Sequence, residues 1–293
     1  MDEVRNIGIV GYGEVGKVFV EGLIQNKFDV NVYDLLTEQG HEEILEDIKN
    51  KGAKPALTIS DLVNESEVIL LLVNSAATKD VIASITKTKQ KPIIIMDLTT
   101  STPYTKKNCK IEIENYHPEA IYIDGAIMGT VATEGFNVPI LLASENEEIM
   151  LTIKKVLTMN IKILLGEVGK AASIKLIRSV FMKGLEALLL ESMIAAKKYN
   201  VDQNVMESIS MTLNNNDFNK FGEALIKTHV IHKNRRYKEI VDSIKLIEDA
   251  KIEPFVTHGV KQFFEYSVEQ DVKPLQSIEE ILTAYGERSV IKN

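Results

Sequence analysis

Apolar residues recur along the chain with two different periods. Six short runs rich in β-branched residues predict strands, and the stretches between them carry apolar positions at helical spacing. This alternation predicts an α/β fold, a doubly wound and mainly parallel sheet with helices between its strands. The predicted strands are NIGIV, DVNVYD, EVILLLV, PIIIMDL, AIYIDGAIM and PILLAS. The first connecting helix has one apolar stripe, formed by Val15, Val18, Phe19, Gly22 and Leu23.

The pattern changes after the segment NIKILLGEVGK. Residues 170–198 form one long helical pattern without proline, and the remainder is also helical, with breaks at NNND, Pro254 and Pro274. We therefore predict two domains, an α/β domain over residues 1–165 and an all-α domain over residues 166–293 that the long helix leads.

Charge and composition narrow the range of partners. The formal net charge of -8 argues against nucleic acid and anionic membranes, which are bound through a basic surface, so a small molecule is the expected partner. The single cysteine, Cys109, has no neighbouring histidine and is expected to be an incidental thiol. The amino terminus lacks the order of a signal peptide and no apolar run reaches membrane-spanning length, so we expect a cytoplasmic protein.

The segment GYGEVG follows the first predicted strand and opens the first predicted helix. Gly11 permits a tight turn, Gly13 lets the backbone approach a diphosphate, and Gly16 lets helix and strand pack closely. Backbone N–H groups at the positive end of the helix dipole then bind the diphosphate. This context predicts a Rossmann dinucleotide-binding domain, with cofactor contacts from Gly11, Tyr12, Gly13, Glu14, Val15 and Gly16.

Asp34 ends the second predicted strand, where its carboxylate can accept hydrogen bonds from the adenosine ribose and would repel a 2′-phosphate. No arginine occurs between Arg5 and Arg178, so the usual clamp for a 2′-phosphate is missing. NAD is therefore the expected cofactor, while lysines leave NADP possible. A Rossmann-like methyltransferase is the alternative class, and the dinucleotide spacing of the glycines argues against it.

Ligands of doubly wound sheets bind beyond the carboxyl ends of the strands. Val73, Asn74 and Thr99 follow two such ends and are expected near the cofactor, with Asn74 and Thr99 at the nicotinamide. Thr100 is expected near substrate. The alternative for the stretch from Thr99 to Thr102 is that it caps the next helix.

The long helix carries a narrow polar sector of about 80° on an otherwise apolar surface. Such a sector is either a solvated edge or the wall of a cavity. Hydride transfer needs a group that exchanges the proton of the alcohol, and a lysine of lowered pKa can do this, with Lys183 or Arg178 as possible neighbouring cations. Lys175 is the candidate. The sector consists of Lys175, Ser179, Lys183 and Glu186.

Four motifs in order resemble the β-hydroxyacid dehydrogenase superfamily, which includes 6-phosphogluconate and 3-hydroxyisobutyrate dehydrogenases. They are GIVGYGEVG, DLTTSTP, DGAIMG and GEVGKAASIKLIRS. In the last motif the family places its catalytic lysine, which falls on Lys175. The string ASIKLIRSVFMKGLEALLLE looks most like a branch described as 6-phosphogluconate dehydrogenase-like, with its own carboxy-terminal helical domain. The resemblance, with the long apolar helices, implies a homodimer formed through that domain.

The departures from the family concern the substrate. Ser179 stands where the family usually has asparagine, and Met128 stands in the family's small, serine- and glycine-rich loop, beside Gly129 and Thr130. Arg235 and Arg236 look like an arginine pair of the branch and could bind an anionic group. The predicted substrate contacts are Thr100, Met128, Gly129, Ser179, Lys183, Arg235 and Arg236.

The expected function is hydride transfer between a nicotinamide cofactor and a small hydroxyacid, or its carbonyl form, with Lys175 as general acid and base. The hydroxyl is expected to lie β to the carboxylate. No metal is expected, because His229 and His232 lack a third ligand and are interpreted as surface histidines. Two alternatives stay open, an imine or ketone reductase on the same fold and a non-catalytic NAD(H)-binding regulatory protein.

Overall fold

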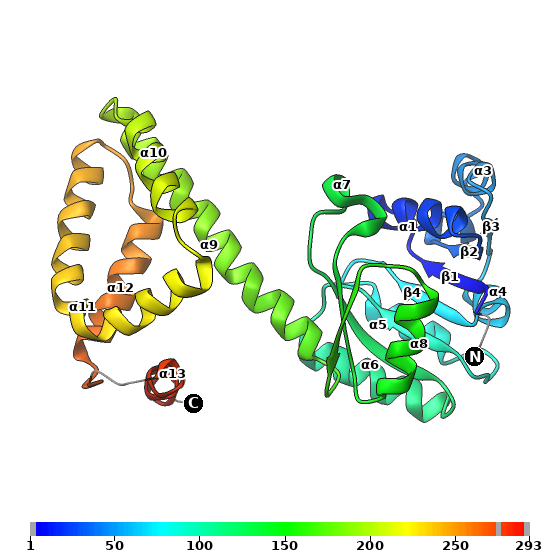
Figure 1. Cartoon of the computed structure of the whole chain (residues 1–293). Helices are drawn as coiled ribbons and strands as arrows, with labels where there is room; N and C mark the ends of the chain where they lie inside the picture. Colours follow the sequence, from blue (N-terminus) through cyan, green and yellow to red (C-terminus); the bar gives the residue numbers. More distant parts are fainter. Residues whose placement is uncertain (1–3, 274–276, 290–293) are drawn as a thin grey trace. The chain divides into compact units, whose positions relative to one another are not determined.

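The structure of the chain, a computed structural model, describes residues 4–273 and 277–289 (Figure 1). The chain divides into two compact units, Met1–Ser179 and Val180–Asn293, and the boundary lies within the long helix α9 (Lys170–Lys198). The helix has the bounds that its apolar pattern predicts. The assignment of cofactor binding to residues 1–165, and of substrate binding and dimerisation to residues 166–293, stays a prediction.

An eight-stranded sheet forms the centre of the first unit, in the order β3-β2-β1-β4-β5-β6-β7-β8. Its neighbours are parallel except at β6 and β7, which run antiparallel. This confirms the predicted α/β class with a mainly parallel, doubly wound sheet. The strands are β1 (Asn6–Val10), β2 (Asp29–Tyr33), β3 (Lys54–Pro55), β4 (Val68–Leu71), β5 (Ile94–Asp97), β6 (Ile121–Ile127), β7 (Ile140–Ser144) and β8 (Ile161–Leu165).

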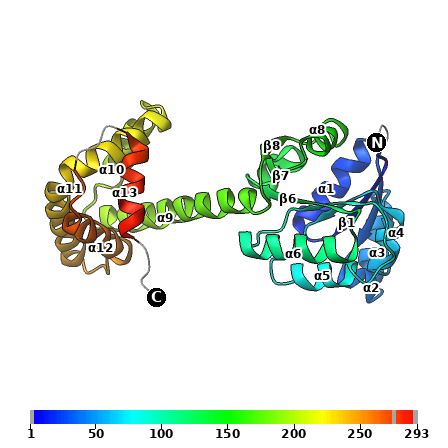
Figure 2. The ribbon, with the colours of Figure 1, turned by 90° about the horizontal axis from the view of Figure 1, so that it is seen from below.

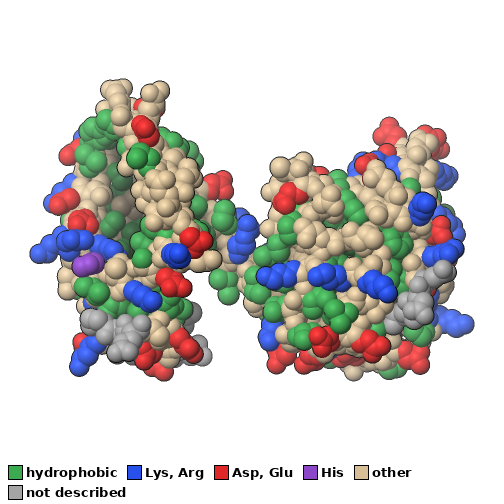
Figure 3. Space-filling view, viewed as in Figure 1, with side chains coloured by type: hydrophobic (Ala, Val, Ile, Leu, Met, Phe, Trp, Pro, Cys, Tyr) green, Lys and Arg blue, Asp and Glu red, His purple; other side chains and the backbone are tan. Residues whose placement is uncertain are grey.

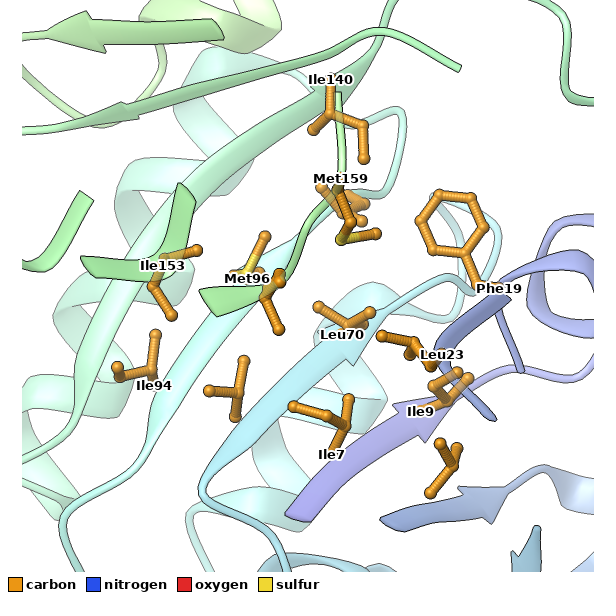
Figure 4. Packing of buried hydrophobic residues seen from close by; sticks show 14 of the residues in the cluster. Ile7, Ile9, Phe19, Leu23, Leu70, Ile94, Met96, Ile140, Ile153 and Met159 are labelled. Atoms are coloured by element: carbon orange, nitrogen blue, oxygen red, sulfur yellow. The ribbon is translucent and has the colours of Figure 1, made fainter. Parts of the chain in front are cut away.

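Helices cover both faces of the sheet, so the inner strands are buried on both sides and read as continuous apolar runs (Figure 2). On one face, Phe19 and Leu23 of α1 and Ile153 of α8 pack against strand residues such as Ile9 and Met96 (Figure 4). The other face is covered by α4, α5 and α6. The helices of this unit are α1 (Glu14–Gln25), α2 (Leu35–Glu38), α3 (Glu42–Asn50), α4 (Ile59–Glu65), α5 (Thr78–Ile85), α6 (Pro103–Tyr116), α7 (Val131–Glu134), the 3₁₀ turn η1 (Gly135–Asn137) and α8 (Glu147–Val156).

Two strands, β3 and β8, lie at the edges of the sheet and were not predicted. β3 has two residues, too few to show a period. In β8, Lys162 and Leu165 are exposed while Ile161 is buried, because an edge strand is covered less than a central one. In the sequence, the short apolar run of β8 therefore looks like part of the connection to the long helix and not like a buried strand.

Four further helices follow α9 in the second unit, and α12 and α13 both pack against α11. Val230, Val272 and Ile281 form a small core among them. The predicted break at Pro254 is confirmed, whereas Pro274 lies outside the described residues. These helices are α10 (Asp202–Asn214), α11 (Phe218–Asp249), α12 (Phe255–Glu269) and α13 (Ile278–Arg288).

His229 is not the surface histidine that was expected. Its Nε2 lies 2.7 Å from the hydroxyl of the fully buried Ser267, and its ring packs edge-on against Phe264 at 5.0 Å between ring centroids. Burial lowers its pKa, as do the charges of Arg236 and Lys233. His229 is therefore half-buried in the packing of α11 on α12, and the interpretation of this residue as a surface histidine was wrong.

Many apolar side chains of α9 to α12 remain at the surface of the single chain (Figure 3). Ile177 and Val180 are 71% and 75% exposed. Within the described residues, no helix combines the length and the apolar character that crossing a membrane requires. The exposed apolar set in α9 consists of Ile174, Ile177, Val180, Phe181, Met182, Leu185, Leu188, Leu190 and Ile194.

Candidate functional site

Two adjoining pockets open at the carboxyl ends of the central strands in the first unit. The first, the Asp34 pocket, has a volume of about 540 Å³ and lies beside the glycine turn, α2 and α5. The second, the Lys175 pocket, has a volume of about 360 Å³ and lies between the start of α1, the ends of β5 and β6, and α9. Leu72 and Val73 line both pockets, so one extended ligand can occupy the two.

The glycine turn needs glycine at two positions for reasons inside the protein. Gly11 has a φ of +105°, and a Cβ there would lie 2.9 Å from the carbonyl carbon of Leu72. A Cβ on Gly16 would lie 2.1 Å from the carbonyl oxygen of Gly11. These two glycines let the chain turn tightly from β1 into α1 and let the helix lie close to the strand.

Gly13 differs, because nothing in the protein lies within 4 Å of a Cβ built on it. It is the N-cap of α1 and supplies no side-chain cap, so the first N–H groups of the helix receive no cap from it. Gly13 also lines the Asp34 pocket. The open space beside an uncapped helix start fits the diphosphate of a dinucleotide, which the Gly13 position, Glu14 and Val15 would hold through their backbone.

Asp34 follows β2 directly and faces the same pocket. Its Oδ2 accepts a hydrogen bond of 2.8 Å from the backbone N–H of Tyr12, and its Oδ1 accepts one of 3.0 Å from Leu36. Asp34 thus caps α2 and fixes the glycine turn at once. Leu35, which follows it, also lines the pocket. The carboxylate keeps free lone pairs for ribose hydroxyls, and no cation lines the pocket among the described residues.

Seven predicted residues meet in the Lys175 pocket. Thr99 and Thr100, from the segment after β5, line it together with Lys175 of α9. The structure also confirms the helix-capping alternative for part of that segment, because the Thr102 hydroxyl accepts the N–H of Thr105 at the start of α6. Thr102 therefore caps the helix, whereas Thr99 and Thr100 of the same segment line the pocket. The pocket also contains the predicted residues Glu14, Val15, Val73 and Gly129.

Lys175 lies in an environment that lowers its pKa. Burial lowers its pKa from the ordinary 10.5, and the positive charge of Lys106 lowers it further. A larger fraction of its amine is then neutral at a given pH than for an exposed lysine. A neutral amine can accept a proton from a hydroxyl group and return it in the reverse direction.

Other predicted residues are placed differently. Asn74 lines the Asp34 pocket, where its Oδ1 accepts the Ala77 N–H. The Tyr12 ring is buried and its hydroxyl donates to Asp47. A contact of Tyr12 with a cofactor would therefore come from its backbone. Met128 packs against the small core at Ala126 and Ala171, and Ser179 follows Lys175 by one helical turn. Neither Met128 nor Ser179 is among the described residues that line the two pockets.

The remaining predicted substrate residues belong to the second unit. Lys183 is exposed on α9. Arg235 is exposed, with its Nε 3.3 Å from Glu239, and Arg236 donates a hydrogen bond of 2.8 Å to the hydroxyl of Thr228. Their roles in substrate binding stay predictions.

The sequence reasoning missed a group of charged residues beneath the Lys175 pocket, formed by Asp97, Lys106 and Asp124, all fully buried. Two signals were present. Each aspartate ends or interrupts an apolar strand, and Lys106 shares a helical stripe with Cys109 and Ile113, the other buried residues of α6. Cys109 itself is buried, which raises its pKa to about 11, in agreement with an incidental thiol.

Family models match two parts of the chain. Residues 6–160 match the family described as the NAD binding domain of 6-phosphogluconate dehydrogenase, and residues 196–267 match a domain of unknown function, DUF1932. An uncharacterized 28.5 kDa protein in the 7S RNA 5′ region of Methanothermus fervidus is 26% identical over 261 residues, which cover 89% of this chain and 98% of that protein.

Two solved structures share the fold. A conserved protein of unknown function, described as structurally similar to 3-hydroxyacid dehydrogenases, is 22% identical, with a TM-score of 0.60 over 97% of this chain and all of its own. A variant imine reductase from Myxococcus stipitatus in complex with NAD⁺ is 14% identical, with a TM-score of 0.79 over 97% of this chain and all of its own. The family match covers more than half of the chain and confirms the resemblance found in the motifs: the chain belongs to the family that carries the NAD-binding domain of 6-phosphogluconate dehydrogenase.

Proposed function

We propose that this protein is an NAD-dependent oxidoreductase that interconverts a small hydroxyacid and its carbonyl form, with Lys175 as the proton-transfer group. The observation that carries the proposal is the position of Lys175 in a pocket that adjoins the Asp34 pocket through Leu72 and Val73. A cofactor whose ribose contacts Asp34 and whose diphosphate contacts the glycine turn would therefore direct its far end towards Lys175.

The proposed reaction transfers one hydride and one proton. A nicotinamide cofactor, when bound, would supply the hydride chemistry, accepting a hydride from the carbinol carbon or returning it. The neutral amine of Lys175 accepts the proton of the substrate hydroxyl at Nζ as the carbon–oxygen bond becomes a carbonyl. In the reverse direction the ammonium form of Lys175 donates that proton to the oxygen. Thr99 and Thr100 line the same pocket, and the exposed Thr100 hydroxyl is available to orient the substrate.

The preference for NAD is part of the proposal. The Asp34 carboxylate supports it, because it would repel a 2′-phosphate in a pocket whose described lining has no arginine or lysine. The anionic character of the substrate and the cytoplasmic location stay predictions from the sequence.

We also propose a homodimer formed through the second unit. The exposed apolar side chains of α9 support it, since contiguous apolar surface of this kind is covered in a stable assembly. A second copy of the chain, with the same surface, is the partner that we propose.

A panel of small hydroxyacids tested with NAD⁺ and NADP⁺, followed by the absorbance of reduced nicotinamide, tests the function. We expect turnover with at least one β-hydroxyacid and its loss in Lys175→Ala. The reverse assay includes ketones and cyclic imines. Turnover of imines alone would favour an imine reductase, and tight NADH binding without turnover would favour a regulatory protein. Equal rates in wild type and Lys175→Ala would exclude the assigned mechanism.

A further inference from the structure

A lysine is fully buried beneath the Lys175 pocket. The ammonium group of Lys106, on α6, donates a hydrogen bond of 2.6 Å to the carbonyl oxygen of Asp97 and lies 2.8 Å from Oδ1 of the same residue. It also lies 3.8 Å from Oδ1 of Asp124. Lysine is almost never fully buried unless it is paired, so these oxygens account for its position.

The register of the sheet explains why a cation is needed there. Asp97 and Asp124 are direct partners in the pairing of β5 and β6, which brings two buried carboxylates side by side. Two like charges at this spacing destabilise each other in a medium of low dielectric constant. Lys106 reaches both from the helix that covers this face, and Asp124 Oδ1 has no hydrogen-bond partner, so the ion pair is its contact.

Each carboxylate connects Lys106 to one wall of the pocket. Asp97 Oδ1 accepts hydrogen bonds from the backbone N–H of Thr99 at 2.9 Å and from its hydroxyl at 2.6 Å. Asp124 Oδ2 accepts three backbone N–H groups at the start of α9, namely those of Gly169 and Ala171 at 2.9 Å and of Ala172 at 3.2 Å. The anion thus satisfies donors that a helix start otherwise leaves unpaired.

The helix turn that Asp124 holds is the turn before Lys175. Ala171 is fully buried and lies four residues before Lys175, which places both on one face of α9. A displacement of the strand end at Asp124 would therefore be transmitted to Lys175, and a displacement at Asp97 would be transmitted to Thr99.

We propose that Lys106 is a positioning residue of the Lys175 pocket, which fixes the strand end that carries Thr99 and the helix turn that precedes Lys175 through its contacts with Asp97 and Asp124. This inference rests on the proposed role of Lys175. It adds a second effect, because the buried positive charge of Lys106 disfavours a proton on Lys175.

The ionisable groups around Lys175 come from several elements. Among the described residues that line its pocket, Glu14 of α1 is the other with an ionisable side chain, and Glu134 of α7 accepts the N–H of the lining residue Thr130. Beneath the pocket lie Lys106 of α6, Asp97 of β5 and Asp124 of β6, and the Tyr122 hydroxyl donates to Asp97. Burial raises the pKa of Asp124, while Lys106 and the three N–H groups act in the opposite direction. Burial is the largest cause of the lowered pKa of Lys175, and the charge of Lys106 adds to it.

The test measures the protonation of Lys175 directly in the full-length protein. Trace acetylation with acetic anhydride between about pH 6 and pH 11, read by peptide mass spectrometry, gives the pKa of Lys175, with the exposed Lys154 as internal reference. Lys106→Met removes the cation, and we expect the pKa of Lys175 to rise towards its ordinary value of 10.5. Asp124→Asn removes an anion from the same group, and we expect the pKa of Lys175 to fall or stay unchanged.

Mere loosening of the fold would hydrate the pocket and raise the pKa of Lys175 in both variants. Opposite shifts of this pKa in the two variants therefore distinguish the effects of charge and positioning from loosening. An unchanged pKa in Lys106→Met, or a rise in both variants, would overturn the proposal. If Lys106→Met does not fold, Lys106→Gln replaces it with the same expected rise, since its amide can still donate to the Asp97 carbonyl. Labelling needs no substrate, so a failed search for turnover affects the proposed function alone.

Discussion

The Oδ2 atom of Asp34 accepts a hydrogen bond of 2.8 Å from the backbone N–H of Tyr12. The residue that follows β2 therefore holds the turn between β1 and α1, and the two parts of the Asp34 pocket are fixed relative to each other before a ligand arrives. Oδ1 of the same carboxylate caps α2 through Leu36. We therefore expect a change of charge at Asp34 to act on the turn and on the proposed preference for NAD together.

The variant Asp34→Asn tests that choice. Its amide group presents a donor where Oδ1 or Oδ2 now accepts, so we expect NADH affinity to fall by at least about tenfold, since a hydrogen bond to a charged group contributes about 1.5–3 kcal/mol. NADPH affinity should fall less, because the repulsion of the 2′-phosphate is removed. Titration of both cofactors by nicotinamide fluorescence measures the two affinities.

Asn146→Ala is the matched control for Asp34→Asn. Asn146 caps α8 by accepting the Ile149 N–H at 3.0 Å, and it lines neither of the two pockets described above. Its loss should cost about 1 kcal/mol of stability and leave both cofactor affinities unchanged. An undiminished preference for NADH over NADPH in Asp34→Asn would contradict the role of this carboxylate.

Gly13 and Gly11 should respond differently to alanine. Gly13 has a φ of -75° and open space at its Cβ position, so Gly13→Ala should leave the free energy of unfolding within about 0.5 kcal/mol of wild type. Its new methyl group would occupy the space proposed for the diphosphate, and NADH affinity should fall by about tenfold or more. Urea unfolding and NADH titration measure the two quantities.

Gly11→Ala gives the contrast. At a φ of +105°, and with backbone atoms of Leu72 at 2.9 Å, this substitution should destabilise the fold itself by about 1–3 kcal/mol. If Gly13→Ala bound NADH as wild type does, the diphosphate would not lie at this turn.

Much of the fold follows from local patterns in the sequence. The central strands are continuous apolar runs because helices cover both of their faces, and α9 is recognisable over its whole length because no proline interrupts it. The antiparallel pairing of β6 and β7 leaves no comparable signal, since register and direction depend on contacts between distant segments. The edge strand β8 was missed for a different reason, because its short run is partly exposed and resembles the connection to the long helix.

The site could be predicted where backbone conformation or strand position requires a residue type, as at Gly11 and Asp34. Lys106 was missed because a periodicity analysis treats lysine as polar, although the residue shares the buried stripe of Cys109 and Ile113. Its burial depends on the register of Asp97 and Asp124, which sequence reasoning does not provide. His229 was misjudged in the same way, since its partner Ser267 lies on another helix.

In the second unit, Glu191 supports a pH-dependent part of the stability. Its carboxylate accepts the N–H groups of Val256 at 2.7 Å and Thr257 at 2.9 Å at the start of α12. Burial raises its pKa, but these hydrogen bonds, with that from the Thr257 hydroxyl, outweigh burial and lower the pKa below 4.5. A carboxyl of lowered pKa stabilises the fold above its unfolded pKa, and this contribution is lost as the pH falls through the folded value.

We therefore expect Glu191→Gln to be about 1–2 kcal/mol less stable than wild type at pH 7, and the difference to shrink below about pH 4. Urea unfolding at both pH values, followed by circular dichroism, measures it. Glu248→Gln, at an exposed position of α11, is the control and should match wild type. A difference that stays constant down to acid pH would show that the charge of Glu191 does not contribute.

The last prediction concerns the proposed homodimer. Val180 and Phe181 are 75% and 52% exposed on α9, and Phe181 contacts Phe218 edge-on at 5.8 Å between ring centroids. Val180→Asp places a charge in the surface that a second copy would cover. Burial of an unpaired charge costs several kcal/mol, so we expect the dissociation constant of the dimer to rise by at least about a hundredfold. Sedimentation equilibrium measures the mass. Glu207→Lys, a charge change at an exposed polar position of α10, should remain dimeric. A wild-type protein that sediments as a monomer at all concentrations would disprove the dimer, and a Val180→Asp dimer as tight as wild type would place the interface elsewhere.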